Sequence, residues 1–399
     1  MALTPSVAAP RAAYVHVPFC RRRCGYCDFA LVAGRDDLQG AYLEALGAEL
    51  GRLEAPLAVD TLYLGGGTPS HLGADGVRRL FAILAHRVGP VLGAEVTLEA
   101  NPGDVTAGFV AAVRACGVTR VSLGAQSLAP ATLSALDRDH SPDDVRRAAD
   151  LLLGAGMEVN VDVMIAAPGQ TTADVEADLD AVAGLGCQHV SVYCLTLERG
   201  TAFEARRRRG DLVPVDEATE RAMFLATLDR LDAAGLEHYE VSNFARPGRR
   251  CRHNETYWDH RPWEAFGPGA ARFDGRTRIG NHRSPFTWMR RVLAGEDPAA
   301  EVERMSEEEA ARERIVLGLR RRDGIDRDRF RAAAGMPLDA LLGSVLPRWV
   351  AAGWASDDVR RVRLTREGLL LSDGLWGEVL APAGGGTGGA GEGRPAASG

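Results

Sequence analysis

Short β-branched segments alternate with longer amphipathic segments through residues 13–243, and this alternation restricts the fold more than any other feature of the sequence. The expected strands are Ala13–Val17, Thr61–Leu64, Glu95–Ala100, Thr119–Gly124, Glu158–Ile165, His189–Leu195 and Tyr239–Asn243. The expected helices are Leu38–Leu53, Val77–His86, Val105–Ala115, Val145–Ala155, Ala173–Leu185 and Ala218–Ala234. Repeated strand–helix units form parallel sheets with right-handed crossovers. Six or seven units are too few to close an eight-stranded barrel, so we expect an α/β fold built on a partial (β/α)6-type barrel.

The pattern changes after this region. Aromatic residues, Pro and Gly become dense up to residue 298, and helical patterns return from Ser306, with a polar β-rich piece at Val359–Leu364 that resembles a wing. The last residues are Gly, Ala and Pro without large apolar side chains, a composition typical of disorder. We therefore expect an N-terminal extension over 1–12, the barrel over 13–250, capping loops over 251–300, a helical and winged-helix-like domain over 301–380, and a disordered tail over 381–399.

Charge and cysteine content exclude several classes of protein. The formal net charge is −7, which does not favour nucleic-acid binding. Seven cysteines in a chain of 399 residues form no paired framework and fit a reducing compartment. The sequence begins without a basic and then apolar leader, and no apolar stretch approaches the ~18 residues of a membrane span. We expect a cytoplasmic protein that is not integral to a membrane.

Three closely spaced cysteines, Cys20, Cys24 and Cys27, follow the first expected strand. Structural zinc sites use four ligands, usually as two separated pairs, and a 4Fe–4S cluster is normally held by four thiolates. Three thiolates leave one iron of such a cluster open to a small molecule. The spacing therefore favours a cluster that binds or reacts, with a zinc site or buried free thiols as the alternatives.

Unusual residues also stand where other expected strands end. The second strand leads into Gly65–Pro69, the third into Glu99–Pro102 and the fourth into Gly124–Ser127, while Asp162 lies within the fifth. Binding sites in parallel sheets gather at the carboxyl ends of strands. Each of these features alone is also typical of a tight turn, a surface charge or a helix cap; together they predict one site.

The run Tyr14-Val-His-Val-Pro-Phe-Cys20 and its Cys-x-x-x-Cys-x-x-Cys motif resemble the radical S-adenosylmethionine (SAM) superfamily, in the branch that includes oxygen-independent coproporphyrinogen III oxidase. The resemblance covers about residues 13–290 and is looser down to Leu380. It implies a 4Fe–4S cluster on the three cysteines, whose open iron chelates SAM. It also implies SAM contacts at positions that match the family: Gly66, Gly67, Thr68, Glu99, Gln126, Arg138 and Asp162, and on weaker grounds Tyr14 and Tyr26.

Two features point within this branch to the HemW-type heme chaperones. The oxidase has a fourth cysteine two residues past the third, where this chain has Phe29 in Cys27-Asp-Phe29. The segment His253-Asn-Glu-Thr-Tyr-Trp258 matches the His-Asn-x-x-Tyr-Trp motif of the chaperones. The resemblance therefore implies heme as a third bound group, held by His253, Asn254, Tyr257 and Trp258.

The residues themselves are compatible with this interpretation and leave alternatives open. Imidazole ligates iron, and Tyr and Trp pack on flat rings. His253 is equally typical of a histidine hydrogen-bonded in an aromatic loop, and His16 and Cys251 are rival ligands. The arginines next to the motif either pair with heme propionates or form a solvated face: Arg249, Arg250 and Arg252.

The leading hypothesis is a heme chaperone that binds a 4Fe–4S cluster, SAM and heme and delivers heme to acceptor proteins, with membrane-associated respiratory enzymes as one class of acceptor. The alternatives are SAM-dependent radical decarboxylation of coproporphyrinogen III, or radical chemistry on another substrate. Whether the chain is an enzyme stays open, as does the choice between a monomer and a homodimer. A nucleic-acid-binding module, suggested by the wing and the arginine run in Gly318–Asp323, is disfavoured because Glu307, Glu308, Glu309 and Glu313 offset that charge.

Overall fold

The computed structural model describes residues 9–381. Most of the predicted N-terminal extension and almost all of the predicted disordered tail lie outside the described residues. None of the helices within 9–381 has the length and apolar character needed to cross a membrane.

One curved sheet of nine strands forms the main body, in the order β11-β1-β4-β5-β6-β7-β8-β10-β9. Its first seven strands run parallel: β11 (Glu264–Phe266), β1 (Ala12–Val17), β4 (Leu57–Gly66), β5 (Val88–Ala100), β6 (Arg120–Gln126), β7 (Glu158–Ile165) and β8 (His189–Cys194). The sheet is open, because its end strands β11 and β9 (Glu237–Glu240) are not paired with each other. The expected parallel α/β architecture with a partial barrel is confirmed.

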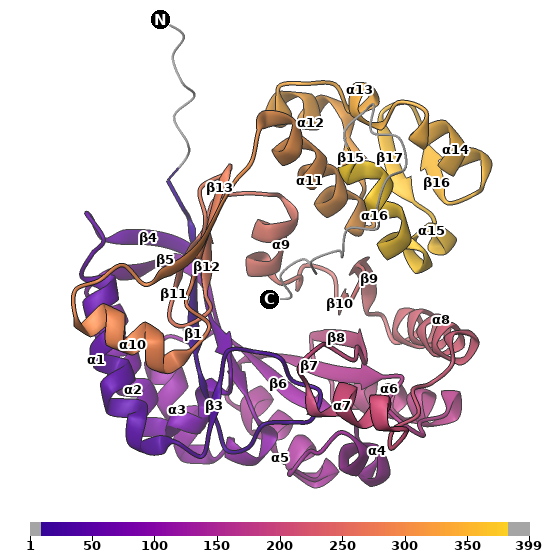
Figure 1. The fold of residues 1–399 in the computed structure, drawn as a ribbon. Helices are drawn as coiled ribbons and strands as arrows, with labels where there is room; N and C mark the ends of the chain where they lie inside the picture. The colour runs from indigo at the N-terminus through magenta and orange to yellow at the C-terminus, as the bar shows by residue number, and fades with distance from the viewer. Residues whose placement is uncertain (1–8, 382–399) are drawn as a thin grey trace, which may run out of the picture.

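Helices connect these strands and pack along the outside of the sheet (Figure 1). They are α1 (Gln39–Leu50), α2 (Gly73–Leu84), α3 (Ala107–Ala115), α5 (Pro142–Gly154), α6 (Thr172–Gly184) and α8 (Glu217–Ala233), with shorter helices α4 (Pro130–Ala135) and α7 (Ala202–Arg209). Local sequence fixes where several begin. Ser141 and Asp144 form a reciprocal capping box at α5, and Thr171 and Asp174 form one at α6, which satisfies N–H groups that a helix start leaves unpaired.

Alternation within the strands divides the sheet into an apolar outer face and a polar inner face. In β6, Val121 and Leu123 belong to the main hydrophobic core, while Arg120 and Ser122 lie on the opposite face of the strand. The same alternation occurs in Glu95-Val-Thr-Leu-Glu99, Glu158-Val-Asn-Val-Asp162 and His189-Val-Ser-Val-Tyr193. Because successive side chains of a strand point to opposite faces, the interior of the partial barrel is lined with hydrogen-bonding and charged groups.

The prediction of a single strand at Tyr239–Asn243 is wrong. This segment contains parts of two strands, β9 and β10 (Asn243–Ala245), which pair antiparallel with each other. β10 also pairs antiparallel with β8. The chain reverses at Val241 and Ser242, so the last strand–helix unit ends in a hairpin at the edge of the sheet.

The segment 251–300, expected as irregular loops, contains regular structure instead. It forms α9 (Arg252–Trp258), β11, β12 (Ala271–Phe273), β13 (Thr277–Asn281), α10 (Pro285–Leu293) and β14 (Ala299–Arg304). β11 extends the main sheet beside β1, and β12, β13 and β14 form a small antiparallel sheet. Figure 1 shows α9 on the inner side of the curved sheet, opposite the outer helices.

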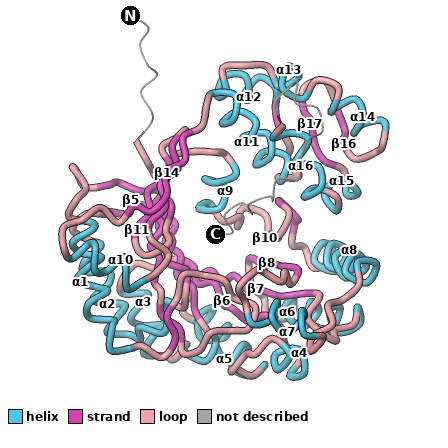
Figure 2. The backbone as a smooth tube through the Cα atoms, viewed as in Figure 1, coloured by secondary structure: helices cyan, strands magenta, loops and turns pink. Residues whose placement is uncertain are grey.

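The C-terminal region builds a second hydrophobic core around Ile315, Leu319 and Trp349. Its helices are α11 (Glu307–Arg320), α12 (Arg327–Ala334), α13 (Leu338–Leu342), α14 (Val345–Ala351), α15 (Arg366–Leu370) and α16 (Ser372–Leu380). They surround three short strands, β15 (Ile325–Asp326), β16 (Ala355–Asp357) and β17 (Arg361–Leu364), apart from the main sheet (Figure 2). The expected helical C-terminal region is present, and β16 and β17 pair as a wing does.

Candidate functional site

The three cysteines lie on the loop that follows β1. Cys20 belongs to a two-residue strand, β2 (Phe19–Cys20), which pairs with β3 (Val32–Ala33). A turn brings the Cys27 N–H to the Cys24 carbonyl at 3.1 Å. The Arg23 guanidinium donates to the carbonyls of Cys27, Phe29 and Leu31 at 3.1–3.3 Å. The loop is therefore shaped by the chain's own hydrogen bonds.

The sulfur atoms have polar neighbours that suit metal-bound thiolates. Cys20 Sγ lies 3.3 Å from the Thr68 hydroxyl, and Arg138 Nη1 donates to Cys24 Sγ at 3.4 Å. Burial raises the pKa of the Cys20 thiol to about 12, because a low dielectric disfavours the thiolate unless a cation or cluster compensates. Within residues 9–381, no three His, Cys, Asp or Glu side chains converge as ligands of one metal ion. A 4Fe–4S cluster does not require three side chains to converge on one atom, because each thiolate binds its own iron at a separate corner.

The glycine-rich segment at the end of β4 packs directly against this loop. Gly66 has φ of +107°, and a Cβ there would lie 2.3 Å from the His16 ring. A Cβ on Gly67 would lie 2.8 Å from the Phe19 carbonyl oxygen. Only glycine fits at both positions. The segment therefore brings Thr68 against Cys20 and presents backbone groups at the carboxyl edge of the sheet.

Two carboxylates stand on strands of the same sheet, Glu99 on β5 and Asp162 on β7, with β6 between them. Glu99 accepts hydrogen bonds from the Tyr63 hydroxyl and the Gly66 N–H, both at 2.9 Å. Asp162 accepts from Ser122 Oγ at 3.0 Å and from Asn160 Nδ2 at 2.8 Å. Burial, together with the charge of Asp162, raises the pKa of Glu99 to about 7, and burial also raises the pKa of Asp162. Because these donors are uncharged, the pair of acids suits a ligand that carries positive charge.

Gln126, Arg138 and Tyr26 complete this end of the interior of the partial barrel, which we call the lumen. A Cβ on Gly124 would lie 3.2 Å from Gln126 Nε2 and 3.5 Å from Arg138 Nη2, so both side chains lie over this glycine. Arg138 Nη2 donates to the Gly124 carbonyl at 2.9 Å. Gln126 has φ of +65°, a conformation that costs a non-glycine residue about 1–3 kcal/mol and clusters at functional sites. The Tyr26 ring packs on Phe203, 5.9 Å between centroids.

A narrow crevice lies deeper in the lumen, lined by Tyr14, Tyr63, His253, Asn254 and Tyr257. The structure therefore places Tyr14, predicted as a SAM contact, beside the predicted heme-binding residues. The Tyr63 ring stacks on Tyr14 at 6.1 Å and on His253 at 5.1 Å between centroids. The crevice has no interior space that would admit even a water molecule, so a macrocycle can enter only if α9 or its side chains move.

His253 is buried, and both of its ring nitrogens have partners. Nδ1 lies 2.9 Å from Thr61 Oγ1, and Nε2 lies 2.8 Å from the Tyr257 hydroxyl. Burial lowers the pKa of His253 to about 3, so the imidazole is neutral at physiological pH. A neutral ring is the form that binds metal, but one of these two contacts must break before iron can be ligated.

The other predicted heme contacts divide between two surfaces. Asn254 and Tyr257 line the crevice, whereas the Trp258 ring faces the Arg320 guanidinium of α11 at 4.6 Å. The rival ligands are also engaged: His16 Nε2 lies 2.7 Å from the Ala30 carbonyl oxygen, and Cys251 Sγ lies 3.5 Å from Glu95 Oε1. The three neighbouring arginines contact Glu158, Asp323 and the Gly93 carbonyl rather than standing free: Arg249, Arg250 and Arg252.

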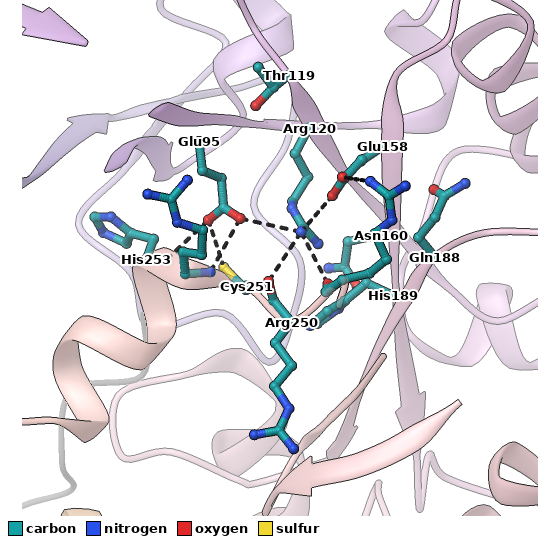
Figure 3. A network of polar contacts seen from close by, with 12 residues as sticks. Glu95, Thr119, Arg120, Glu158, Asn160, Gln188, His189, Arg250, Cys251 and His253 are labelled. Atoms are coloured by element: carbon teal, nitrogen blue, oxygen red, sulfur yellow. Dashed lines mark hydrogen bonds and ion pairs between the residues drawn. The ribbon is translucent and has the colours of Figure 1, made fainter. Parts of the chain in front are cut away.

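Four residues that join these groups were not predicted from the sequence, namely Thr61, Tyr63, Glu95 and Arg120. Tyr63 connects the two ends of the lumen, because its hydroxyl donates to Glu99 while its ring stacks on His253. Glu95 contacts the start of α9, and Arg120 contacts Glu95 and the residues that precede α9 (Figure 3). The sequence feature that could have indicated these residues is the polar–apolar alternation of β4, β5 and β6, because strands that are buried on both faces are usually continuously apolar.

Comparison with known protein families gives two matches within the chain. Residues 14–182 match the radical SAM superfamily, and residues 305–371 match the HemN C-terminal domain. The first match contains the cysteines, the glycine-rich segment and both carboxylates, and the second lies in the C-terminal helical region.

Individual relatives match over almost the whole chain. Heme chaperone HemW of Mycobacterium tuberculosis is 39% identical over 383 residues, covering 94% of this chain and 95% of that protein. Heme chaperone HemW of Bacillus subtilis is 31% identical, covering 93% and 99%. The mouse mitochondrial radical S-adenosyl methionine domain-containing protein 1 is 34% identical, covering 93% and 88%.

Among solved structures, coproporphyrinogen III oxidase (HemN) from Escherichia coli superposes with a TM-score of 0.83 at 21% identity, covering 93% of this chain and 90% of that one. This likeness shows a shared fold.

Replacing Glu99 by Gln is expected to change how stability depends on pH. The pKa of Glu99 in the folded protein, about 7, lies above its ordinary value of 4.5. Between pH 4.5 and 7 the folded protein therefore keeps a proton that the unfolded chain has lost. The resulting contribution of Glu99 to the free energy of unfolding is full below about pH 4.5 and is lost as the pH rises through 7. Relative to Glu99→Gln, the wild-type protein should therefore lose roughly 2–3 kcal/mol of unfolding free energy between pH 5 and 8, measured by urea denaturation without ligands. Glu44→Gln, on the exposed side of α1, is the control, and a pH-independent difference for Glu99→Gln would contradict the assignment.

Proposed function

We propose, from the membership of this chain in the HemW family of the radical SAM superfamily, that it is a cytoplasmic heme chaperone that binds a 4Fe–4S cluster, SAM and heme and passes heme to acceptor proteins. One observation carries the proposal: His253 of the His-Asn-x-x-Tyr-Trp motif lies in an aromatic crevice whose Tyr63 donates to Glu99. Glu99 in turn accepts from Gly66 of the glycine-rich segment, which brings Thr68 beside Cys20. Acceptors are heme proteins, and membrane-associated respiratory enzymes are the class to test first.

In this proposal Cys20, Cys24 and Cys27 hold the cluster, which when bound supplies an open iron that chelates the amino and carboxylate groups of SAM. Arg138 donates to one sulfur and Thr68 lies beside another, so both stabilise thiolate charge. Gly66, Gly67 and Thr68 line the ligand with backbone groups. Glu99 and Asp162 complement its positive charge, while Gln126, Arg138 and Tyr26 border it.

Heme, as cargo, is proposed to bind through His253 Nε2. With its proton on Nδ1 and donated to Thr61, the ring keeps a lone pair on Nε2, which the Tyr257 hydroxyl occupies in this structure. Iron would replace that hydroxyl, and Tyr14, Tyr63 and Tyr257 supply flat faces for the macrocycle. A second partner on the other nitrogen is the usual way that proteins orient a ligating histidine. Asn254, also on the crevice, is placed to contact the macrocycle, and Trp258 would contribute from the side of α11.

Coproporphyrinogen III decarboxylation is the second candidate, favoured by the intact pocket of two carboxylates. The oxidase branch carries a fourth cysteine, and Phe29, which stands at that position here, is 42% exposed and offers neither a metal ligand nor a proton. An anaerobic assay with reductant, SAM and substrate that yields a vinyl product would favour this function over the chaperone.

Anaerobic reconstitution with iron and sulfide tests the cluster. The wild-type protein should take up about four irons per chain, and SAM should change the electron paramagnetic resonance spectrum of the reduced cluster. Replacing Cys20, Cys24 or Cys27 singly by Ser should abolish stable uptake, while Cys116→Ser, at the end of α3, should leave it unchanged. Stoichiometric zinc, or equal iron in all variants, would contradict the proposal.

Heme titration followed by absorbance tests the ligand. His253→Ala should weaken binding and shift the Soret band, because the iron loses its imidazole. Tyr257→Phe should tighten binding about fivefold, because the ring remains while the hydroxyl that competes for Nε2 is removed. With the pKa of His253 near 3, protonation of this ring should not limit binding between pH 5 and 8. Equal affinity and spectra for the wild-type protein and His253→Ala would exclude His253 as the ligand.

A further inference from the structure

Helix α9, which carries His253, begins without a cap of its own. Its N-cap residue is Cys251, whose side chain accepts no hydrogen bond from the helix. The first turn of a helix leaves N–H groups unpaired, and a helix of seven residues is too short to be stable alone. The position of α9 must therefore be set by groups elsewhere in the chain.

Glu95 of β5 supplies the missing acceptor. Its Oε1 accepts the His253 N–H at 3.0 Å, and its Oε2 accepts the Arg252 N–H at 3.2 Å. The Cys251 thiol donates to Oε1 at 3.5 Å. The carboxylate is only 7% exposed, so it is held by these contacts rather than by solvent.

Arg120 of β6 holds Glu95 in place (Figure 3). Its Nη2 lies 3.3 Å from Glu95 Oε2 and 2.7 Å from Glu158 Oε2. The same nitrogen donates to the carbonyls of Arg249 and Arg250 at 3.1 and 3.3 Å, in the segment that leads into α9. One guanidinium thus fixes both the capping carboxylate and the approaching backbone.

The other end of α9 meets a cation. Arg314 Nη1 of α11 donates to the carbonyl of Asp259, the C-cap residue, at 2.8 Å. A carboxylate at the start of a helix and a guanidinium at its end both complement the helix dipole.

We propose that Glu95, oriented by Arg120, is a positioning residue for His253: it fixes where α9 starts and hence how the imidazole stands in the crevice. The expected effect on heme binding rests on the proposed function, whereas the effect of Glu95 on the position of α9 can be tested without heme.

Amide hydrogen exchange of the ligand-free full chain tests the effect of Glu95 on the position of α9. Glu95→Ala should accelerate exchange in residues 252–258 about tenfold, because two N–H groups lose their acceptor. Glu95→Gln, whose single acceptor oxygen can serve only one of the two N–H groups, should restore part of the protection. Asp178→Ala is the matched control, since it removes another buried carboxylate that accepts a backbone N–H, from Leu128 at 2.8 Å. Unchanged exchange in Glu95→Ala, or equal acceleration in the control, would overturn the inference.

Heme titration of the same variants, with His253→Ala alongside, tests the effect on heme binding. Glu95→Ala should weaken heme binding about tenfold and broaden the Soret band. Glu95→Gln, with one acceptor oxygen in place of two, should recover part of the affinity, and Asp178→Ala should resemble the wild-type protein. If His253→Ala binds heme as the wild-type protein does, the proposed ligand fails while the exchange result still decides the role of Glu95. If His253→Ala loses heme and Glu95→Ala binds it normally, the positioning role alone is wrong.

Discussion

The ion pair between Glu95 and Arg120, inside the sheet, is the interaction on which the placement of α9 depends. Both side chains are almost fully buried, at 7% and 3% exposure, and burying charges costs free energy that their attraction only partly offsets. Apolar residues on these strands would pack without that cost, as they do on the outer face. The pair instead connects two strands to a segment more than 120 residues away. Its carboxylate accepts two of the N–H groups with which α9 begins. A polar interior is therefore what allows a short helix to lie within the partial barrel.

The same interior joins the two ends of the lumen. Tyr63 contacts Glu99 through its hydroxyl and His253 through its ring. A second connection runs through hydrogen bonds: Asn160 donates to Asp162 and lies 2.6 Å from His189 Nδ1, and His189 Nε2 lies 2.8 Å from the Tyr239 hydroxyl, which accepts the Cys251 N–H. Helix α9 is therefore connected to both carboxylates through packed and hydrogen-bonded side chains.

The architecture was predictable because it depends on local patterns. The strand–helix alternation indicated the parallel sheet, and residues such as Gly66, Glu99 and Gln126 stand at strand ends where the topology brings them together. The hairpin at Glu237–Ala245 was not predicted, because no Gly or Pro marks the reversal at Val241 and Ser242. Strand β11 was not predicted, because its pairing partner β1 lies far away in the sequence. The partners of His253 were missed for the same reason, since Thr61 is 192 residues distant. Glu95 and Arg120 were recognisable only as polar positions in strands that otherwise read as buried, and that pattern does not reveal which groups they contact.

The most direct test of the account is an anaerobic crystal structure of the wild-type protein with SAM and heme bound. The account predicts a cubane on Cys20, Cys24 and Cys27, SAM between the open iron and the carboxylate pair, and heme iron on His253 Nε2 with the Tyr257 hydroxyl displaced and Glu95 still bound to the start of α9. Heme bound outside the lumen with the His253–Tyr257 contact intact, or a single metal ion between the cysteines, would contradict it.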